Sequence, residues 1–193
     1  MFWRLDMQDI YDKYYWQNDK VRLRAMRPED DNYLEKLDSE SWAMAAQELV
    51  LPPVKKEAKE ATEDDLKAWQ DESKPVFSIE NLDGDYVGHI QFNDINERHG
   101  TCEIGVSIWH NFKNKGYGKA AVEIILGYIF NERRLNKVNA DCIGCNIASI
   151  SLMRSLGFQQ EGEIREAIFF HGKFHSRLIF GLTANEYRLR SIV

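Results

Sequence analysis

Two spacings of apolar residues run along this chain and predict its secondary structure. Alternation of apolar and polar residues, as in Val21 to Met26, is typical of strands, because successive side chains point to opposite faces. Apolar residues three or four positions apart predict helices. The predicted strands span residues 21–26, 75–80, 86–93, 101–108, 137–142, 164–170 and 174–182. One predicted helix begins at Pro28, and the others span residues 41–51, 62–70, 118–131 and 146–156.

Turn residues between these segments indicate how the strands pair. Asp83-Gly84 is a strong hairpin signal, and a second turn at residues 97–100 leads into strand 101–108. The strands at 75–80, 86–93 and 101–108 are therefore expected to be antiparallel neighbours. Strand 137–142 follows a helix, and such a crossover favours parallel pairing with strand 101–108. The predicted fold class is α/β of the α+β type, with a mixed, mostly antiparallel central sheet, one parallel strand pair and flanking helices.

A basic loop at residues 111–119 lies between strand 101–108 and the helix that follows. The first N–H groups of a helix have no partner within the helix and carry partial positive charge, so they bind anions. Gly116 and Gly118 have no Cβ atom, which lets backbone amides approach a phosphate closely. We expect this loop to bind a pyrophosphate. The residues expected to bind it are Lys113, Asn114, Lys115, Gly116, Tyr117, Gly118 and Lys119.

Composition limits the class of protein. With 193 residues, of which 44% are hydrophobic and 12% aromatic, the chain is expected to form one globular domain with an ample core. No apolar run approaches the length of a membrane span, and residues 1–20 lack the apolar centre of a signal peptide. Three cysteines do not suggest a secreted disulfide framework. The expected location is the cytoplasm, with no membrane partner.

Charge is distributed unevenly along the chain, although the net charge is only −6. Residues 1–100 contain 13 Lys and Arg against 23 Asp and Glu, whereas residues 101–193 contain 12 against 8. The acidic first half argues against nucleic-acid binding and suits an amine or another cationic partner. The basic second half suits an anionic ligand. Acidic residues that only aid solubility are the alternative explanation.

The first twenty residues form an aromatic extension that is distinct from the rest of the chain. Its aromatic residues are Phe2, Trp3, Tyr11, Tyr14, Tyr15 and Trp16. Such side chains favour burial, so the extension is expected to dock either on the domain or on a second subunit as a homodimer contact. The expected organisation is an extension at 1–20, a domain at 21–185 and a C-terminal tail at 186–193.

The order of elements, β-α-α-β-β-β, basic loop, α-β-α-β-β, resembles the GNAT N-acetyltransferases. That family's acyl-CoA loop reads Gln/Arg-x-x-Gly-x-Gly/Ala, and here the segment from Lys113 to Gly118 matches it. The family's later helix begins Asn-x-x-Ala/Ser and ends at Gly-Phe, as in Asn146 to Ser149 and in Gly157-Phe158. The His171-Gly172-Lys173 hairpin, followed by residues 179–182, is similar to the branch that acetylates ribosomal-protein N-termini (RimJ/RimL-like).

The resemblance implies acetyl-CoA as co-substrate, without a metal. Its pyrophosphate would bind the basic loop, and the parallel strands would splay apart to admit pantetheine. Backbone groups near Val106 and Ile108 would bind pantetheine and polarise the thioester carbonyl, and Asn146 and Ser149 would bind along the pantetheine arm. The expected activity is acetyl transfer to a primary amine, either a protein N-terminus, a polyamine or another small amine.

The resemblance also suggests catalytic residues, with two departures from the family pattern. Glu103, on the strand that leads to the loop, is expected to accept the amine proton, the alternative being a solvated or ion-paired carboxylate. Lys113 replaces the usual Gln or Arg, and Met153 occupies the position of the usual tyrosine acid. Ser151, Tyr117 or solvent would then protonate the leaving thiolate. Met153 also motivates an alternative function, a catalytically weak protein that binds or senses acyl-CoA.

The same residues also partly fit three other kinds of site. Gly116-Tyr117-Gly118 followed by Ala121 fits a degenerate dinucleotide-binding motif, but too many polar residues separate the strand from the glycines. A Walker loop is excluded because Ala120 follows Lys119. Cys142 and Cys145 form a C-x-x-C pair without two further zinc ligands at suitable spacing, although a redox pair stays open.

The histidines and two of the tryptophans give weaker signals. The five histidines form no ligand pattern, and His110 beside the loop suits the surface better than a phosphate contact. Trp42 and Trp69 suit either core packing or the wall of an acceptor pocket, because residues 41–75 are expected to lie over the site.

Overall fold

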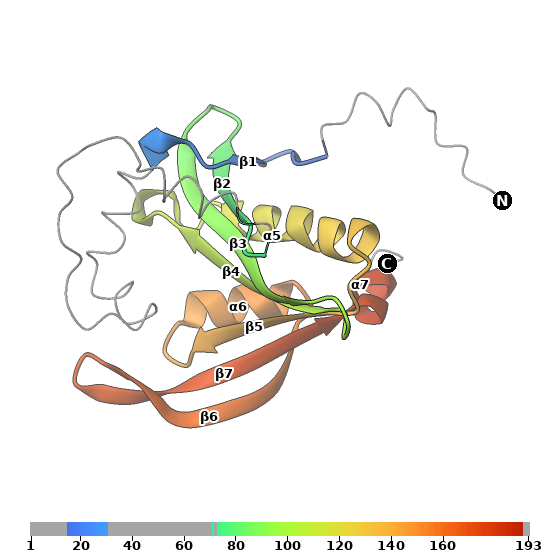
Figure 1. Ribbon diagram of the computed structural model, residues 1–193. Coiled ribbons are helices and arrows are strands. Elements are labelled where there is room, and N and C mark those ends of the chain that lie inside the picture. The colour runs from blue at the N-terminus through green and yellow to red at the C-terminus, as the bar shows by residue number, and fades with distance from the viewer. Residues whose placement is uncertain (1–14, 31–70, 72, 191–193) are drawn as a thin grey trace.

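A single mixed sheet organises the molecule in the computed structural model, which describes residues 15–30, 71 and 73–190. The seven strands lie in the order β1-β2-β3-β4-β5-β7-β6 (Figure 1). Their bounds are Val21–Ala25 (β1), Val76–Asn81 (β2), Tyr86–Asn96 (β3), Thr101–Ile108 (β4), Lys137–Ile143 (β5), Gln159–Phe170 (β6) and Lys173–Thr183 (β7). The helices are α5 (Tyr117–Gly127), α6 (Ile147–Ser155) and α7 (Ala184–Arg190), with short helical turns η1 (Pro28–Asp30), η2 (His110–Phe112) and η3 (Tyr128–Glu132).

Strands β2, β3 and β4 pair antiparallel, as the sequence predicts, β1 adds to them antiparallel at the edge of the sheet, and α5 packs against all four strands. The helix buries the apolar stripe that includes Ala121, Ile124 and Ile125, each no more than 8% exposed. The helix is shorter than predicted, because after Gly127 the chain widens into the π-helical turn η3. This packing holds the N-terminus of α5 beside the end of β4, where the basic loop lies.

Strands β4 and β5 are parallel, also as predicted, but they pair over only three residues each. Thr101, Cys102 and Glu103 lie opposite Lys137, Val138 and Asn139. Beyond Glu103 and Asn139 the two strands diverge (Figure 1). The remaining five residues of β4 and four residues of β5 are therefore unpaired with each other, and the sheet opens into a wedge.

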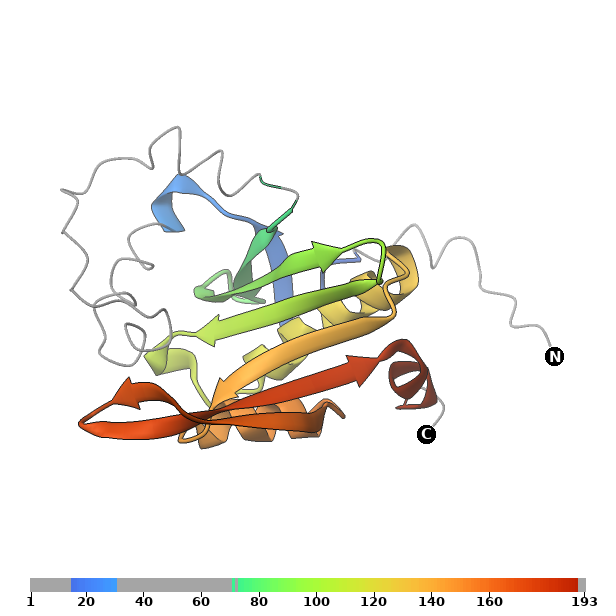
Figure 2. The same ribbon diagram turned by 60° about the horizontal axis from the view of Figure 1, so that its bottom comes forward.

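The β6–β7 hairpin forms the other edge of the sheet and reaches beyond the end of β5 (Figure 2). Strand β6 begins at Gln159, five residues before the predicted start at 164. The sequence did not reveal this part because its residues are polar and mostly exposed on both faces, so no apolar alternation marks it. Likewise β3 continues to Asn96 through residues that are half-buried or exposed.

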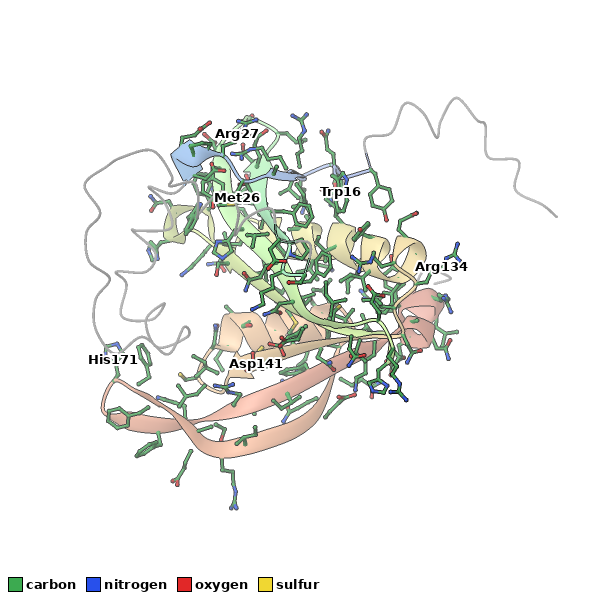
Figure 3. All side chains as sticks on the ribbon, in the orientation of Figure 1. Trp16, Met26, Arg27, Arg134, Asp141 and His171 are labelled. Atoms are coloured by element: carbon green, nitrogen blue, oxygen red, sulfur yellow. The ribbon has the colours of Figure 1, made fainter. Side chains whose placement is uncertain are left out.

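The described end of the aromatic extension packs on the domain. The Trp16 ring stacks on Phe77 at 5.1 Å and lies 4.8 Å from Tyr128 on η3, so it connects β2 to the end of α5 (Figure 3). Docking on the domain is thus confirmed for Trp16, whereas residues 1–14 and their expected dimer contact lie outside the described residues. The same holds for the predicted helices at 41–51 and 62–70 and for Trp42 and Trp69.

Helix α7 covers most of the segment that the sequence left as a tail, and Tyr187 packs its ring 4.9 Å from that of Phe130. The helices found within residues 15–30, 71 and 73–190 are all too short or too polar to span a lipid bilayer.

Candidate active site

A cleft of about 580 Å³ lies between β4, the basic loop and α6. Its position follows from the divergence of β4 and β5, because the ends of these two strands beyond Glu103 and Asn139 are not paired with each other. The lining residues are Val106, Ser107, Ile108, Phe112, Lys113, Asn114, Gly116, Tyr117, Gly118, Lys119, Cys145, Asn146, Ile147, Ala148, Ser149 and Leu152. The structure thus brings together all the predicted cofactor-binding residues except Lys115.

The N-terminus of α5 opens directly onto this cleft. Gly116 caps the helix with φ 84°, a left-handed conformation that favours glycine. The first backbone hydrogen bond of the helix runs from Ala120 N to Gly116 O (3.1 Å), so the amides of Tyr117, Gly118 and Lys119 precede the helical ladder. These amides and the helix dipole form an anion-binding end.

Gly118 leaves room for a ligand to approach the backbone at the start of α5. A Cβ atom on this residue would stand 3.4 Å from Ile108 Cγ1 and 3.6 Å from Leu152 Cδ2. Any larger side chain would therefore extend into the space between β4 and α6. The donors and the available volume fit the phosphates and the pantetheine arm of an acyl-CoA.

The lysines of the basic loop do not all face the cleft. Lys113 and Lys119 are among its lining residues, whereas Lys115 is not. The Lys115 ammonium lies 5.1 Å from the centre of the Phe112 ring, in a cation–π contact. Its expected phosphate contact stays a prediction.

Helix α6 and the residues just before it, including the predicted Asn146, form the wall of the cleft that faces β4. Asn146 caps the helix, because its Oδ1 accepts a hydrogen bond from Ser149 N (3.0 Å), and this leaves Nδ2 as the end that can donate to a ligand. The Ser149 hydroxyl lies 3.0 Å from Cys142 Sγ. The predicted site residues on this wall did not include Cys145, Ile147, Ala148 and Leu152, although helical spacing from Asn146 and Ser149 could have indicated Leu152.

Glu103 lies where the wedge begins, at the last pair of the parallel junction, and is not among the residues that line the cleft. Strand alternation places it on the face opposite to buried Cys102 and Ile104, and it is half-buried. Burial raises the pKa of its carboxyl above the usual range, and the nearby Asp141 and Asp94 raise it further, while Arg177 lowers it. Arg177 itself pairs with Asp141 (3.4 Å; Asp141 is labelled in Figure 3). The raised pKa suits a group that accepts protons.

The three residues discussed for the general acid lie in different environments. Met153 is 3% exposed and belongs to the hydrophobic core, so it faces away from solvent. Ser151 is exposed on α6 and does not line the cleft, whereas Tyr117 does. The role expected of Ser151 stays a prediction.

The competing interpretations find little support. The antiparallel pairing of β1 to β4 contradicts the parallel sheet of a dinucleotide-binding fold. The three cysteines are free thiols, Cys142 buried and Cys145 exposed. Among the described residues, no group of three His, Cys, Asp or Glu side chains is arranged to hold a metal ion.

Comparison with known proteins gives a consistent result. The family model described as an acetyltransferase (GNAT) domain matches residues 20–159. The SPbeta prophage-derived N-acetyltransferase YokL of Bacillus subtilis is 30% identical over 91% of this chain and 96% of its own length. The spermidine N(1)-acetyltransferase of Escherichia coli is 26% identical over 86% of this chain and 88% of its own. YdaF of Bacillus subtilis, named for a proposed ribosomal N-acetyltransferase activity, is 24% identical over 88% and 94%.

Solved structures confirm the fold. The spermidine N-acetyltransferase from Vibrio cholerae, in complex with CoA and spermine, superposes with a TM-score of 0.73 over 89% of this chain and 99% of that chain, at 20% identity. The mixed sheet with one splayed parallel pair is therefore the GNAT fold that the sequence motifs implied. Since a GNAT model covers most of the domain and a relative matches nearly its whole length, the chain belongs to the GNAT acetyltransferases and is an N-acetyltransferase.

Proposed function

We propose that this enzyme transfers an acetyl group from acetyl-CoA to a cationic primary amine in the cleft between β4 and α6. The observation that carries the proposal is the end of β4–β5 pairing at Glu103, which opens the wedge beside the glycines of the basic loop. Acetyl-CoA supplies a thioester whose carbonyl carbon the neutral amine can attack. The enzyme would act in the cytoplasm, which agrees with its three cysteines and the polar residues 1–20.

Three groups of residues would hold the co-substrate. The amides at the start of α5, with Gly116 and Gly118, would bind the pyrophosphate, and Lys113 and Lys119 would neutralise its charge. Asn146 Nδ2 would donate to pantetheine. The unpaired edge of β4 around Val106 to Ile108 offers backbone N–H groups for polarising the thioester carbonyl.

Glu103 would accept the proton that the amine loses, directly or through water. Its raised pKa makes it a stronger base than an ordinary carboxylate and favours this role over that of an ion-paired surface group. The proton needed by the departing thiolate would come from Tyr117, which lines the cleft, or from solvent.

The acceptor that we propose is a polyamine such as spermidine. Glu103 on β4 interacts electrostatically with Asp141 on β5 and Asp94 on β3, and a polycation bound beside these carboxylates would offset their mutual repulsion. The identity to the spermidine acetyltransferase of E. coli agrees with this choice. A peptide N-terminus is the second candidate, because YdaF is named for ribosomal acetylation.

The test is thiol release from acetyl-CoA with spermidine, a peptide with a free N-terminus, or no acceptor. We expect Glu103→Gln to lower kcat by about 10²-fold or more, with the Kd of acetyl-CoA nearly unchanged. Glu123→Gln, which removes an exposed carboxylate on α5, is the matched control. Full activity of the Glu103 variant would refute the base, and a strong preference for the peptide would refute the polyamine assignment.

A further inference from the structure

The turn that precedes β1 is fixed to the first turn of α5. Asn18 Nδ2 donates a hydrogen bond to Ala120 O (3.0 Å), across 102 positions of sequence. Asn18 Oδ1 accepts from Lys20 N (3.1 Å) and Val21 N (3.0 Å), which closes the turn. The position of Lys20 is therefore set relative to the basic loop, although Lys20 belongs to the N-terminal extension.

The Lys20 side chain extends over the glycine that caps α5. Its Nζ lies 3.1 Å, and its Cδ 3.9 Å, from the point where a Cβ atom on Gly116 would stand. The absence of a side chain at Gly116 is what gives the ammonium room. The basic loop thus receives a positive charge from a second segment of the chain.

The Lys20 ammonium adds to the positive charge at this end of α5. The helix dipole places partial positive charge at the same end of α5, and the loop contributes Lys113 and Lys119, which line the cleft. Within the part of the chain that the structure describes, no carboxylate forms an ion pair with the Lys20 ammonium. A bound phosphate would compensate the converging charges.

We propose that Lys20 is a further phosphate-binding residue for acyl-CoA and that the N-terminal turn is part of the co-substrate site. The inference rests on the proposed acetyl-CoA site and adds to it a residue that the loop motif does not contain. Acyl-CoA carries a pyrophosphate and a 3′-phosphate, and a lysine ammonium suits either as a point charge. Asn18 acts as a positioning residue that holds the turn against α5.

The experiment is calorimetric titration of acetyl-CoA at low salt into wild type, Lys20→Gln and Lys74→Gln. Lys74 is exposed and does not line the cleft, so it controls for the loss of a surface charge. We expect Lys20→Gln to raise the Kd about three- to tenfold, whereas Lys74→Gln should leave it nearly unchanged. Asn18→Ala should raise the Kd to a smaller extent, because the ammonium remains but is no longer fixed.

A second titration with 3′-dephospho-CoA distinguishes the two phosphates. If Lys20 binds the 3′-phosphate, the difference between wild type and Lys20→Gln disappears with this ligand. If Lys20 binds the pyrophosphate, the difference persists. Tight binding by wild type with an unchanged Kd for Lys20→Gln would overturn the inference alone, whereas failure of wild type to bind acetyl-CoA would overturn the proposed function and this inference with it.

Discussion

At the scale of single residues, the base is tuned by its neighbours. Glu103 is half-buried and interacts electrostatically with the carboxylates of Asp141 and Asp94 and with the positive charge of Arg177. Burial and the two carboxylates raise the pKa of Glu103, because each disfavours its charged form. Asp141 also holds Arg177 in an ion pair, so this one carboxylate affects Glu103 in two ways.

Asp141→Asn should therefore lower the pKa of Glu103. The substitution removes a repelling charge and releases Arg177 to stabilise the Glu103 carboxylate. A base is active above its pKa, so the lower inflection in the pH profile of kcat/KM should move to lower pH. The upper inflection, which reports the acceptor amine, should not move. An unchanged lower inflection would show that Glu103 does not cause it.

Much of the cleft was predictable from sequence at this scale, but some residues were not. The loop motif and Asn146 identify residues by type and spacing, and the structure brings nearly all of them together. The orientation of Lys115 toward Phe112 depends on loop geometry that spacing does not encode. The approach of Lys20 to Gly116 depends on long-range packing, for which the sequence offers no local signal.

At the scale of elements, a buried ionic network fixes the end of β1. Arg24 donates from Nη1 and Nη2 to the two Asp30 oxygens (2.7 and 3.0 Å) and from Nε to Glu80 Oε2 (2.8 Å). Ser78 Oγ and Arg27 N also donate to Asp30 Oδ2, at 2.7 and 2.9 Å. The network joins β1, η1 and β2, beside Met26 and Arg27 in Figure 3.

Asp30→Asn should destabilise the fold by about 3 kcal/mol, because it breaks a buried ion pair. Burial raises the pKa of Asp30, but hydrogen bonds from Arg24 and Ser78 outweigh this, so the pKa lies below its usual value. The stabilisation is then complete above the unfolded pKa of about 3.9 and is lost as pH falls through the lowered folded pKa.

Urea unfolding at neutral and acidic pH measures this effect. The difference in free energy of unfolding between wild type and Asp30→Asn should be constant near neutrality and shrink at acidic pH. Asp83→Asn, in the exposed β2–β3 turn, should change stability little at any pH. A cost below about 1 kcal/mol would mean that the network contributes no more than exposed ion pairs do.

Elements with one buried face were predicted best. The stripe on α5 and the alternation in β4 are each set by a core on one side, so sequence spacing reports them. The start of β6 was missed because an exposed edge strand buries little on either face. The early end of α5 was missed because the change to π-helical geometry over Tyr128–Glu132 leaves the apolar pattern almost intact.

At the scale of the whole molecule, the sheet consists of two parts with a narrow connection. Strands β1 to β4 form one part and β5, β7 and β6 the other, and backbone pairing joins them at three residue pairs. The proposed acetyl-CoA site includes β4 from the first part and α6, which follows β5, from the second. A bound co-substrate would contact both parts.

Acetyl-CoA should therefore raise the melting temperature of the protein. At 100 times its Kd, a ligand that binds only the folded state stabilises it by about 2.7 kcal/mol. For a chain of this size the expected rise in Tm is about 5–10 °C. Gly118→Trp, which would place a large side chain between Ile108 and Leu152, should show no rise. Equal rises in both proteins would place the binding site elsewhere.

The three-pair connection also has a consequence for the order of folding. The β2–β3–β4 and β6–β7 strands are joined by short turns and can pair early, whereas the β4–β5 pair closes only after the α5 crossover has formed. The wedge between β4 and β5 would then be among the last parts to assemble. Co-substrate bound there would act mainly on the rate of unfolding and leave the folding rate almost unchanged.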